Sequence, residues 1–136
     1  MKDGNRAQRI LLAEDDDALR TLLAEVLTEA GHAVTTAHTA NALERAVIDA
    51  IAGSPSVHFD LLITDLHMPG TDTFAVLERL GNAGVRPPTL VLSAFADDAA
   101  LVEAYRIGCL CMLAKPFDMD DLLLVVTLLG ESTRKS

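Results

Sequence analysis

The chain has 136 residues, 50% of them hydrophobic, which is enough to bury the core of one domain and excludes an intrinsically disordered polypeptide. Its formal net charge of −9 argues against direct nucleic-acid binding, because contacts to a phosphate backbone need clustered Lys and Arg. No apolar stretch reaches the roughly 18 residues of a membrane span, and the start MKDGNRAQ has no apolar signal-peptide core, so we expect a cytoplasmic protein without membrane contact.

Short β-like runs alternate with longer helix-like segments along the chain. The expected strands are residues 9–13, 32–37, 61–65, 89–93 and 111–114. The expected helices are approximately residues 18–30, 39–51, 73–83, 97–107 and 118–129. This alternation predicts an α/β fold in which a parallel sheet carries helices on both faces, connected by right-handed crossovers.

Turn and cap residues predict where the elements and the domain end. Gly130 is expected to end the last helix, and Thr73 to cap the start of the third helix. The sequence has neither internal repeats nor a low-complexity segment, so we expect a single domain. The expected divisions are a flexible segment over residues 1–8, the domain over 9–130 and a frayed polar tail over 131–136.

Polar residues stand at or just after the ends of four apolar runs. They are Glu14 and Asp15, then Asp65, Ser93 and Lys115. Because the carboxyl ends of parallel strands meet at one edge of a sheet, where open α/β folds bind ligands, we expect these residues to lie together. Three carboxylates offer the oxygen ligands that Mg²⁺ prefers. With a hydroxyl and a lysine beside them, they predict a phosphorylation site.

Each of these residues taken alone has a simpler interpretation. The acidic run 14–17 suits the start of a helix, where carboxylates cap free N–H groups and interact well with the helix dipole. Asp65 alone is typical of a turn residue, Ser93 of a loop hydroxyl and Lys115 of a solvated charge. The prediction of a site therefore depends on all of them mapping to one sheet edge, where grouped carboxylates need a neutralising cation.

Four stretches of the sequence, in this order, carry a resemblance to a known family: ILLAEDDDALR, DLLITDLHMPG, LVLSAFAD and LAKPF. Over about residues 9–129, the chain resembles the receiver domains of response regulators in bacterial two-component signalling. The resemblance implies a flavodoxin-like, doubly wound (βα)5 sandwich with parallel strand order 2-1-3-4-5. It also implies a phosphorelay module rather than a conventional enzyme, with a histidine kinase or a histidine phosphotransfer protein as the phosphoryl donor.

The resemblance gives the polar residues of the sheet edge specific roles. Asp65 would accept the phosphoryl group, Ser93 would hydrogen-bond one of its oxygens, and Lys115 would pair with another. The implied Mg²⁺ ligands, direct or through water, are Glu14, Asp15, Asp65 and the backbone carbonyl of His67. The peptide bond between Lys115 and Pro116 would be cis, which proline permits at small cost.

The chain departs from the family pattern at Met112, where relatives usually carry a Tyr or Phe that turns inward with the Ser/Thr. Met is flexible and apolar, so Met112 could still act as a switch by changing rotamer, or Phe95 could fill the space in its place. The His67 side chain, beside the phosphoryl site, could steer water, although an exposed loop His contributing only its carbonyl is the simpler interpretation.

The segment LLLVVTLL, residues 122–129, is apolar nearly all round, whereas a helix packed on a sheet should be apolar on one stripe. Leu124 and Leu128 are expected to point outward, with Leu110 beside the same surface. This predicts a partner-docking or homodimer surface that spans the fourth helix, fifth strand and fifth helix. The alternative is a deeply seated last helix that the tail covers.

Three other functions fit parts of the sequence. A Mg²⁺-dependent phosphatase that forms an aspartyl-phosphate would need a second acid/base Asp where this chain has His67. A flavin-binding module would need a phosphate loop after the first strand, but the acidic residues 14–17 would repel a phosphate. A receiver-like scaffold that signals without phosphorylation is opposed by the presence of every primary site residue.

Overall fold

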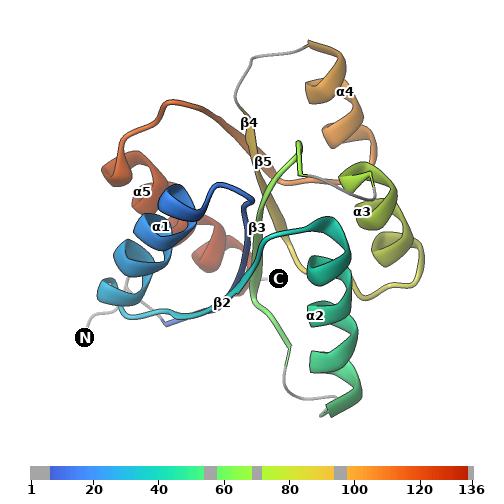
Figure 1. The fold of residues 1–136 in the computed structure, drawn as a ribbon, viewed down its shortest axis with the longest axis horizontal. Coiled ribbons are helices and arrows are strands. Elements are labelled where there is room, and N and C mark those ends of the chain that lie inside the picture. The colour runs from blue at the N-terminus through green and yellow to red at the C-terminus, as the bar shows by residue number, and fades with distance from the viewer. Residues whose placement is uncertain (1–6, 54–57, 69–71, 94–97, 135–136) are drawn as a thin grey trace.

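The computed structural model describes residues 7–53, 58–68, 72–93 and 98–134 of the chain. Five parallel strands form one sheet in the order β2-β1-β3-β4-β5 (Figure 1). The strands are β1 (Arg9–Ala13), β2 (Ala33–Ala37), β3 (Leu61–Asp65), β4 (Thr89–Ser93) and β5 (Cys111–Ala114). The helices are α1 (Asp17–Glu29), α2 (Ala40–Gly53), α3 (Thr73–Asn82), α4 (Asp98–Arg106) and α5 (Met119–Arg134). This order confirms the expected flavodoxin-like fold.

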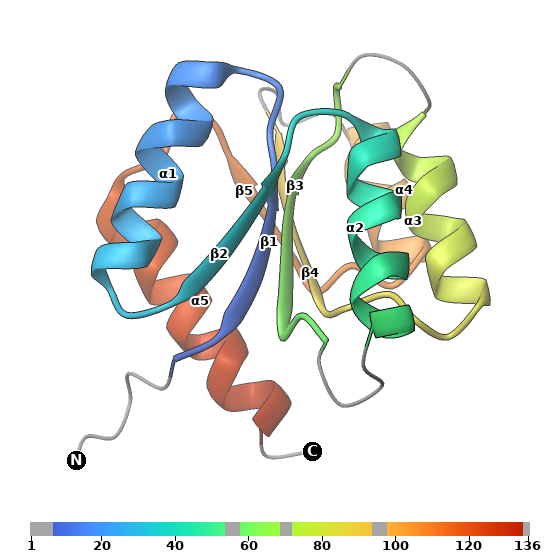
Figure 2. The same cartoon turned by 60° about the horizontal axis from the view of Figure 1, so that its bottom comes forward.

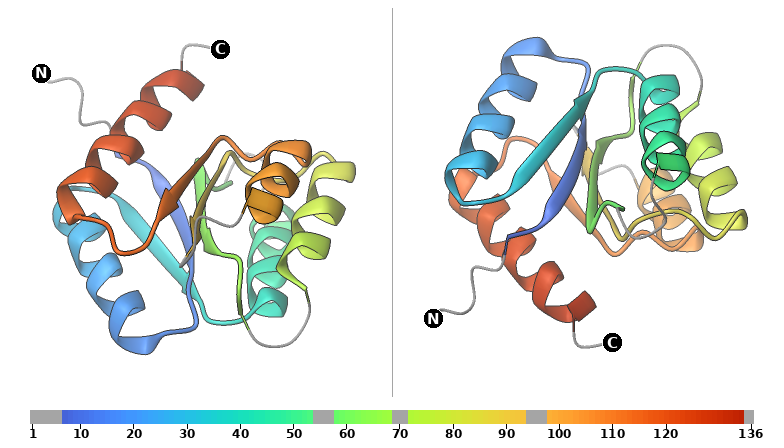
Figure 3. Two further views of the ribbon diagram at one scale, coloured as in Figure 1. Left: turned by 90° about the horizontal axis from the view of Figure 1, so that it is seen from above. Right: turned by 90° about the horizontal axis from the view of Figure 1, so that it is seen from below.

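The sheet lies between two layers of helices (Figure 2). Helices α1 and α5 cover one face, and α2, α3 and α4 cover the other, as both views of Figure 3 show. Along β1, Leu11 and Ala13 pack into the core under α2–α4, whereas Ile10 and Leu12 pack into the core under α1 and α5. A strand covered on both faces must be apolar throughout, because successive side chains point to opposite sides.

Among the described residues, none of the helices combines the length and the apolar character that crossing a membrane requires.

The register of the sheet brings four strand ends to one edge. The last residue of β1 lies beside Thr64 of β3, and the last residues of β4 and β5 lie beside each other. The residues that this places at the carboxyl edge are Glu14, Asp65, Ser93 and Lys115. This is the edge at which open α/β sheets bind ligands, so the fold alone brings the polar residues together.

Helix α5 continues past Gly130 to Arg134, so the prediction that Gly130 ends this helix is wrong. A Cβ at position 130 would lie 2.5 Å from Nε2 of Gln8, so the Gln8 side chain would have to shift to admit a larger residue. Gln8 is buried, and its Nε2 donates to the carbonyl oxygen of Val126 at 3.1 Å. The residue is therefore part of the packed domain rather than of a flexible segment 1–8.

The start of α3 also differs from the prediction. Asp72, not Thr73, is the N-cap, and its Oδ1 accepts a hydrogen bond from the backbone N–H of Phe74 at 3.0 Å. Thr73 is the first helical residue and is buried. Asp and Thr both cap helices well, so the sequence alone does not show which of the two neighbours is the N-cap. The structure makes the exposed Asp72 the cap, because Thr73 is buried.

Burial lowers the pKa of His32, which lies between α1 and β2 and accepts at Nδ1 a hydrogen bond from the backbone N–H of Gln8 at 3.0 Å. In the unfolded chain the imidazole keeps its ordinary pKa of about 6.5, so below that pH the unfolded state binds the proton first. The neutral imidazole therefore contributes stability that is fully present above that pH and is lost as the pH falls toward the lower pKa of the folded state.

We expect the free energy of unfolding of the parent protein to fall as the pH is lowered below about 6.5, and this fall to be smaller in a His32→Gln variant. Urea unfolding at a series of pH values measures it. His38→Gln removes an exposed histidine and should keep the slope of the parent. Equal slopes for the parent and His32→Gln would contradict the prediction.

Candidate functional site

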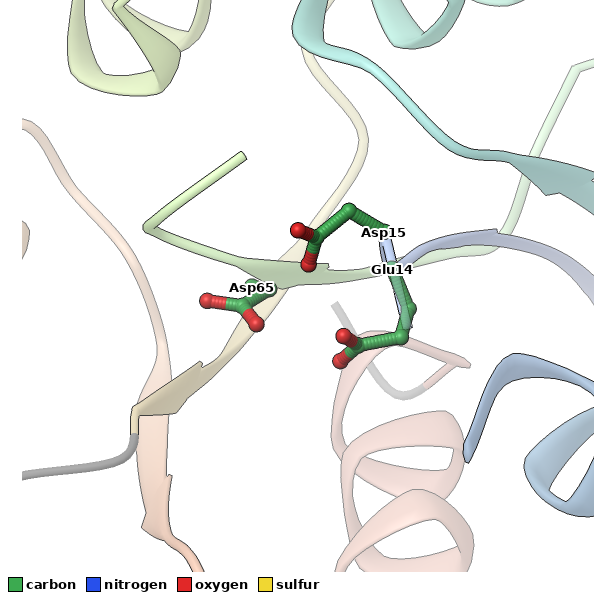
Figure 4. A group of neighbouring side chains, drawn as sticks. All are labelled: Glu14, Asp15 and Asp65. Carbon is green, nitrogen blue, oxygen red and sulfur yellow. The ribbon is translucent and has the colours of Figure 1, made fainter. Parts of the chain in front are cut away.

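Three carboxylates converge at the carboxyl edge of the sheet (Figure 4). Glu14 and Asp15 follow β1, and Asp65 is the last residue of β3. One oxygen atom from each residue lies within 4.8 Å of the others. Glu14 is 1% exposed and Asp65 is 6% exposed, whereas Asp15 is open to solvent. Two buried anions at this distance need a neutralising cation.

Lys115 supplies positive charge to the two buried carboxylates. Its Nζ donates to Glu14 Oε1 at 3.0 Å and to Asp65 Oδ2 at 2.8 Å. The lysine directly follows β5, its backbone N–H donates to the carbonyl oxygen of Ser93 at 2.6 Å, and its peptide bond to Pro116 is cis, as the resemblance implies. The lysine is therefore held beside the two carboxylates by its backbone as well as by its ammonium group.

The pKa values of this pair follow from burial and mutual contact. Burial raises the pKa of Glu14, and the hydrogen bond from Lys115 opposes this effect without reversing it. Burial would lower the pKa of Lys115, but hydrogen bonds to Asp65 and Glu14 outweigh it, so that pKa is raised. The ammonium group therefore stays charged at neutral pH and screens the carboxylates.

Two backbone N–H groups also bind the carboxylates. The N–H of His67 donates to Asp65 Oδ1 at 2.8 Å, and the N–H of Asp16 donates to Glu14 Oε2 at 3.1 Å. Both oxygens of Glu14 and both of Asp65 thus accept a hydrogen bond. In the described part of the chain, the Asp15 carboxylate accepts none and faces solvent. These N–H donors could not be predicted from the sequence, because every residue except proline carries a backbone N–H and no side chain marks the ones that bind.

The arrangement fits a Mg²⁺ ion. All three side chains offer oxygen, the ligand type that this cation prefers. Ligands on opposite sides of Mg²⁺ lie about 4.2 Å apart, twice the usual bond length. The spacing of up to 4.8 Å needs only a small side-chain movement or an intervening water. Each oxygen of Glu14 and of Asp65 already accepts a hydrogen bond, whereas the exposed Asp15 carboxylate accepts none from the described residues, so Asp15 is the best placed of the three for direct contact.

The remaining residues of the prediction lie at different depths around this centre. Ser93 is buried at the end of β4, next to the strand that carries Asp65. Met112 of β5 is half-buried and packs against the core under α2–α4. The side chain of His67 is exposed, and Phe95 lies outside the described residues.

Leu110, Leu124 and Leu128 lie on the surface, and each is about half exposed. Leu122 and Val126 of α5 are fully buried in the core under α1 and α5. Leu124 and Leu128 therefore point away from this core, and the role of their surface stays a prediction.

A model of the response regulator receiver domain family matches residues 10–127. The chain belongs to this family. It is a receiver domain of the two-component response regulator type. An aspartyl-phosphate phosphatase and a phosphorylation-independent scaffold are not favoured by this match. In this family, an acidic pocket binds Mg²⁺ and histidine kinases provide the phosphoryl group.

Relatives of this receiver domain are mostly longer proteins. The DNA-binding transcriptional regulator NtrC of Klebsiella pneumoniae is 33% identical over 115 residues, which are 85% of this chain and 23% of NtrC. The sensory/regulatory protein RpfC of Xanthomonas campestris is 36% identical over 134 residues, which are 96% of this chain and 18% of RpfC. The chain thus spans less than a quarter of each of these two relatives.

Among solved structures, the non-phosphorylated HemR receiver domain of Leptospira biflexa matches with a TM-score of 0.78 and 28% identity. The match covers 90% of this chain and 94% of that domain. The likeness therefore extends over almost the whole of a receiver domain.

Proposed function

We propose that Asp65 accepts a phosphoryl group from the phosphohistidine of a histidine kinase or a histidine phosphotransfer protein. The observation that carries this proposal is the buried Asp65 carboxylate, which lies within hydrogen-bonding distance of Lys115 and beside Glu14 and Asp15. A carboxylate oxygen of Asp65 attacks phosphorus and forms the new P–O bond. The P–N bond of the donor breaks, and its electron pair returns to the imidazole nitrogen, leaving an acyl phosphate.

Each residue of the site contributes to this transfer by position and charge. We propose that Asp15, Asp65 and the His67 carbonyl hold the Mg²⁺ ion, with Glu14 acting through water and as the anchor of Lys115. The bound cation neutralises the charge of the incoming phosphoryl group. Lys115 pairs with one phosphoryl oxygen, and the Asp16 and His67 N–H groups keep the carboxylates in place. The transfer would then depend on positioning and charge rather than on covalent chemistry by other side chains. We therefore propose a phosphoacceptor rather than a conventional enzyme.

Formation of the acyl phosphate would also change the conformation of the domain. The acyl phosphate adds about 1.5 to 2 negative charges at the sheet edge. The Ser93 hydroxyl and the Lys115 ammonium are the groups that bind the new oxygens, and Met112 on the neighbouring strand follows by changing rotamer. A cytoplasmic location belongs to the same proposal, since the sequence predicts one.

Acetyl phosphate tests the proposal without a partner kinase. Intact mass after incubation with acetyl phosphate and Mg²⁺ should show the gain of one phosphoryl group, and EDTA should prevent the gain. Absence of any gain at every Mg²⁺ concentration, even with a purified histidine phosphotransfer protein as donor, would contradict the proposed chemistry.

The output surface is proposed to be the exposed leucines Leu110, Leu124 and Leu128, with a second copy of this chain as the occupant. Leu124 and Leu128 are one turn apart on α5, so two copies of the helix can pack by the same residues across a two-fold axis. The first turn of α5 carries Asp120 and Asp121, which would repel their equivalents in any pairing that brings the two first turns together. The apolar contact must therefore outweigh that repulsion.

We expect the phosphorylated parent protein to form dimers, and a Leu124→Ser, Leu128→Ser double variant to remain monomeric. Removing two exposed apolar side chains should raise the dimer dissociation constant by roughly 100-fold or more, because each buried side chain contributes about 1.5–3 kcal/mol and about 1.4 kcal/mol corresponds to a factor of ten. Sedimentation equilibrium measures this, with Ile48→Ser, an exposed apolar residue of α2, as the matched control. A parent that stays monomeric at high concentration in both phosphorylation states would rule out the homodimer.

A further inference from the structure

Arg20 of α1 binds the acidic loop that follows β1. Its Nη1 donates to the main-chain carbonyl oxygen of Glu14 at 2.9 Å, and its Nη2 pairs with Asp17 Oδ1 at 2.5 Å. The Arg20 side chain is only 20% exposed, although that of Asp17 is open to solvent. A guanidinium held in this way is a fixed donor rather than a solvated surface charge.

These contacts fix Glu14 along its whole length. The Glu14 N–H donates to the carbonyl oxygen of Ala37 in β2 at 3.0 Å. Its carboxylate accepts from Lys115 and from the Asp16 N–H. Its carbonyl oxygen accepts from Arg20. The segment that leaves β1 is therefore held by a strand, a loop and a helix.

The contact with Arg20 has a direct consequence for Asp15. A peptide group is planar, so holding the Glu14 carbonyl fixes the plane that also contains the N–H and the Cα of Asp15. The Asp15 carboxylate accepts no hydrogen bond from the described residues, so the direction of its side chain depends on this backbone. Figure 4 shows the Asp15 carboxylate turned toward Asp65.

We propose that Arg20 is a positioning residue that holds the Glu14–Asp15 peptide so that the Asp15 carboxylate faces the divalent cation. The inference rests on the proposed Mg²⁺ site and extends it to a residue outside the cluster of acidic ligands. Asp17 contributes to this arrangement. Its carboxylate balances the charge of Arg20, so the guanidinium can lie beside a cation site with little repulsion.

Removing Arg20 should change the Mg²⁺ affinity in opposite directions, depending on whether its charge or its positioning role matters more. A pure Coulomb effect would tighten Mg²⁺ binding, because one positive charge near the site is lost. A loss of positioning would weaken binding, because groups that orient metal ligands typically contribute roughly 10- to 100-fold to affinity. The sign of the change therefore separates the two.

We expect Arg20→Met to weaken Mg²⁺ affinity roughly tenfold, measured by isothermal titration calorimetry. Arg20→Lys keeps the charge and one donor for the Glu14 carbonyl, and should recover most of the affinity. The rate of phosphorylation by acetyl phosphate should be reduced in Arg20→Met at low Mg²⁺ and should approach that of the parent at saturating Mg²⁺. An equal loss of rate at low and at saturating Mg²⁺, in an Arg20→Met protein that circular dichroism shows to be folded, would mean that the defect does not act through the metal site.

Arg45→Met, which removes an exposed arginine from α2, is the matched control and should bind Mg²⁺ as the parent does. Circular dichroism checks folding, and Arg20→Ala, with the residue of highest helix propensity, replaces the Met variant if that one does not fold. Unchanged or tighter binding in Arg20→Met or Arg20→Ala would overturn the inference alone. A parent that binds no Mg²⁺ would overturn both the inference and the proposed metal site.

Discussion

Replacing Asp65 with Asn is expected to abolish the gain of one phosphoryl group that the parent protein shows with acetyl phosphate and Mg²⁺. Asn has nearly the same shape and can still accept from the His67 N–H, so the fold should be preserved. Its amide oxygen carries no full negative charge and is a far weaker nucleophile than a carboxylate. Intact mass spectrometry measures the loss, which should be complete.

Two further variants make this result specific. Asp49→Asn removes an exposed carboxylate of α2 and should leave phosphorylation unchanged. Asp15→Asn keeps the acceptor but removes the carboxylate that accepts no hydrogen bond from the described residues, and should raise the Mg²⁺ concentration needed for half-maximal phosphorylation. A phosphoryl group that persists in Asp65→Asn, located on another residue by peptide mapping, would show that the acceptor has been misassigned.

The second large effect is expected from Lys115→Met. The variant leaves Glu14 and Asp65 buried side by side without their cation. Removing one partner of a buried ion pair typically costs about 3–5 kcal/mol. Because Lys115 is 21% exposed, and because Glu14 can take up a proton, we expect a loss of about 2 kcal/mol in the free energy of unfolding in EDTA.

Mg²⁺ should restore more stability to Lys115→Met than it adds to the parent, because in the parent the ammonium group and the metal ion compete for the same carboxylates. Urea unfolding with and without Mg²⁺ measures both values, and Arg45→Met controls for the loss of a surface cation. If Mg²⁺ stabilised the two proteins equally, Lys115 and the metal would not share these ligands.

Short-range patterns in the sequence determined most of the fold. The strand limits at residues 61–65, 89–93 and 111–114 agree with the structure, because a continuous apolar run between turn residues is a local signal. The polar residues at the strand ends were found in the same way. Parallel strands with helical crossovers place every strand end at one edge, so Asp65 and Lys115 could be brought together without knowing the contacts between them.

The contacts that depend on distant parts of the chain were decided only by the tertiary structure. Gly130 looks like a helix end in the sequence, but Gln8 packs where its side chain would be, and α5 continues. Arg20 looks like one charge on a helix surface, but its guanidinium holds the carbonyl of Glu14. The physical reason is the same in both cases. Periodicity and propensity describe neighbours along the chain, whereas space-filling and backbone hydrogen bonds depend on which segments folding brings side by side.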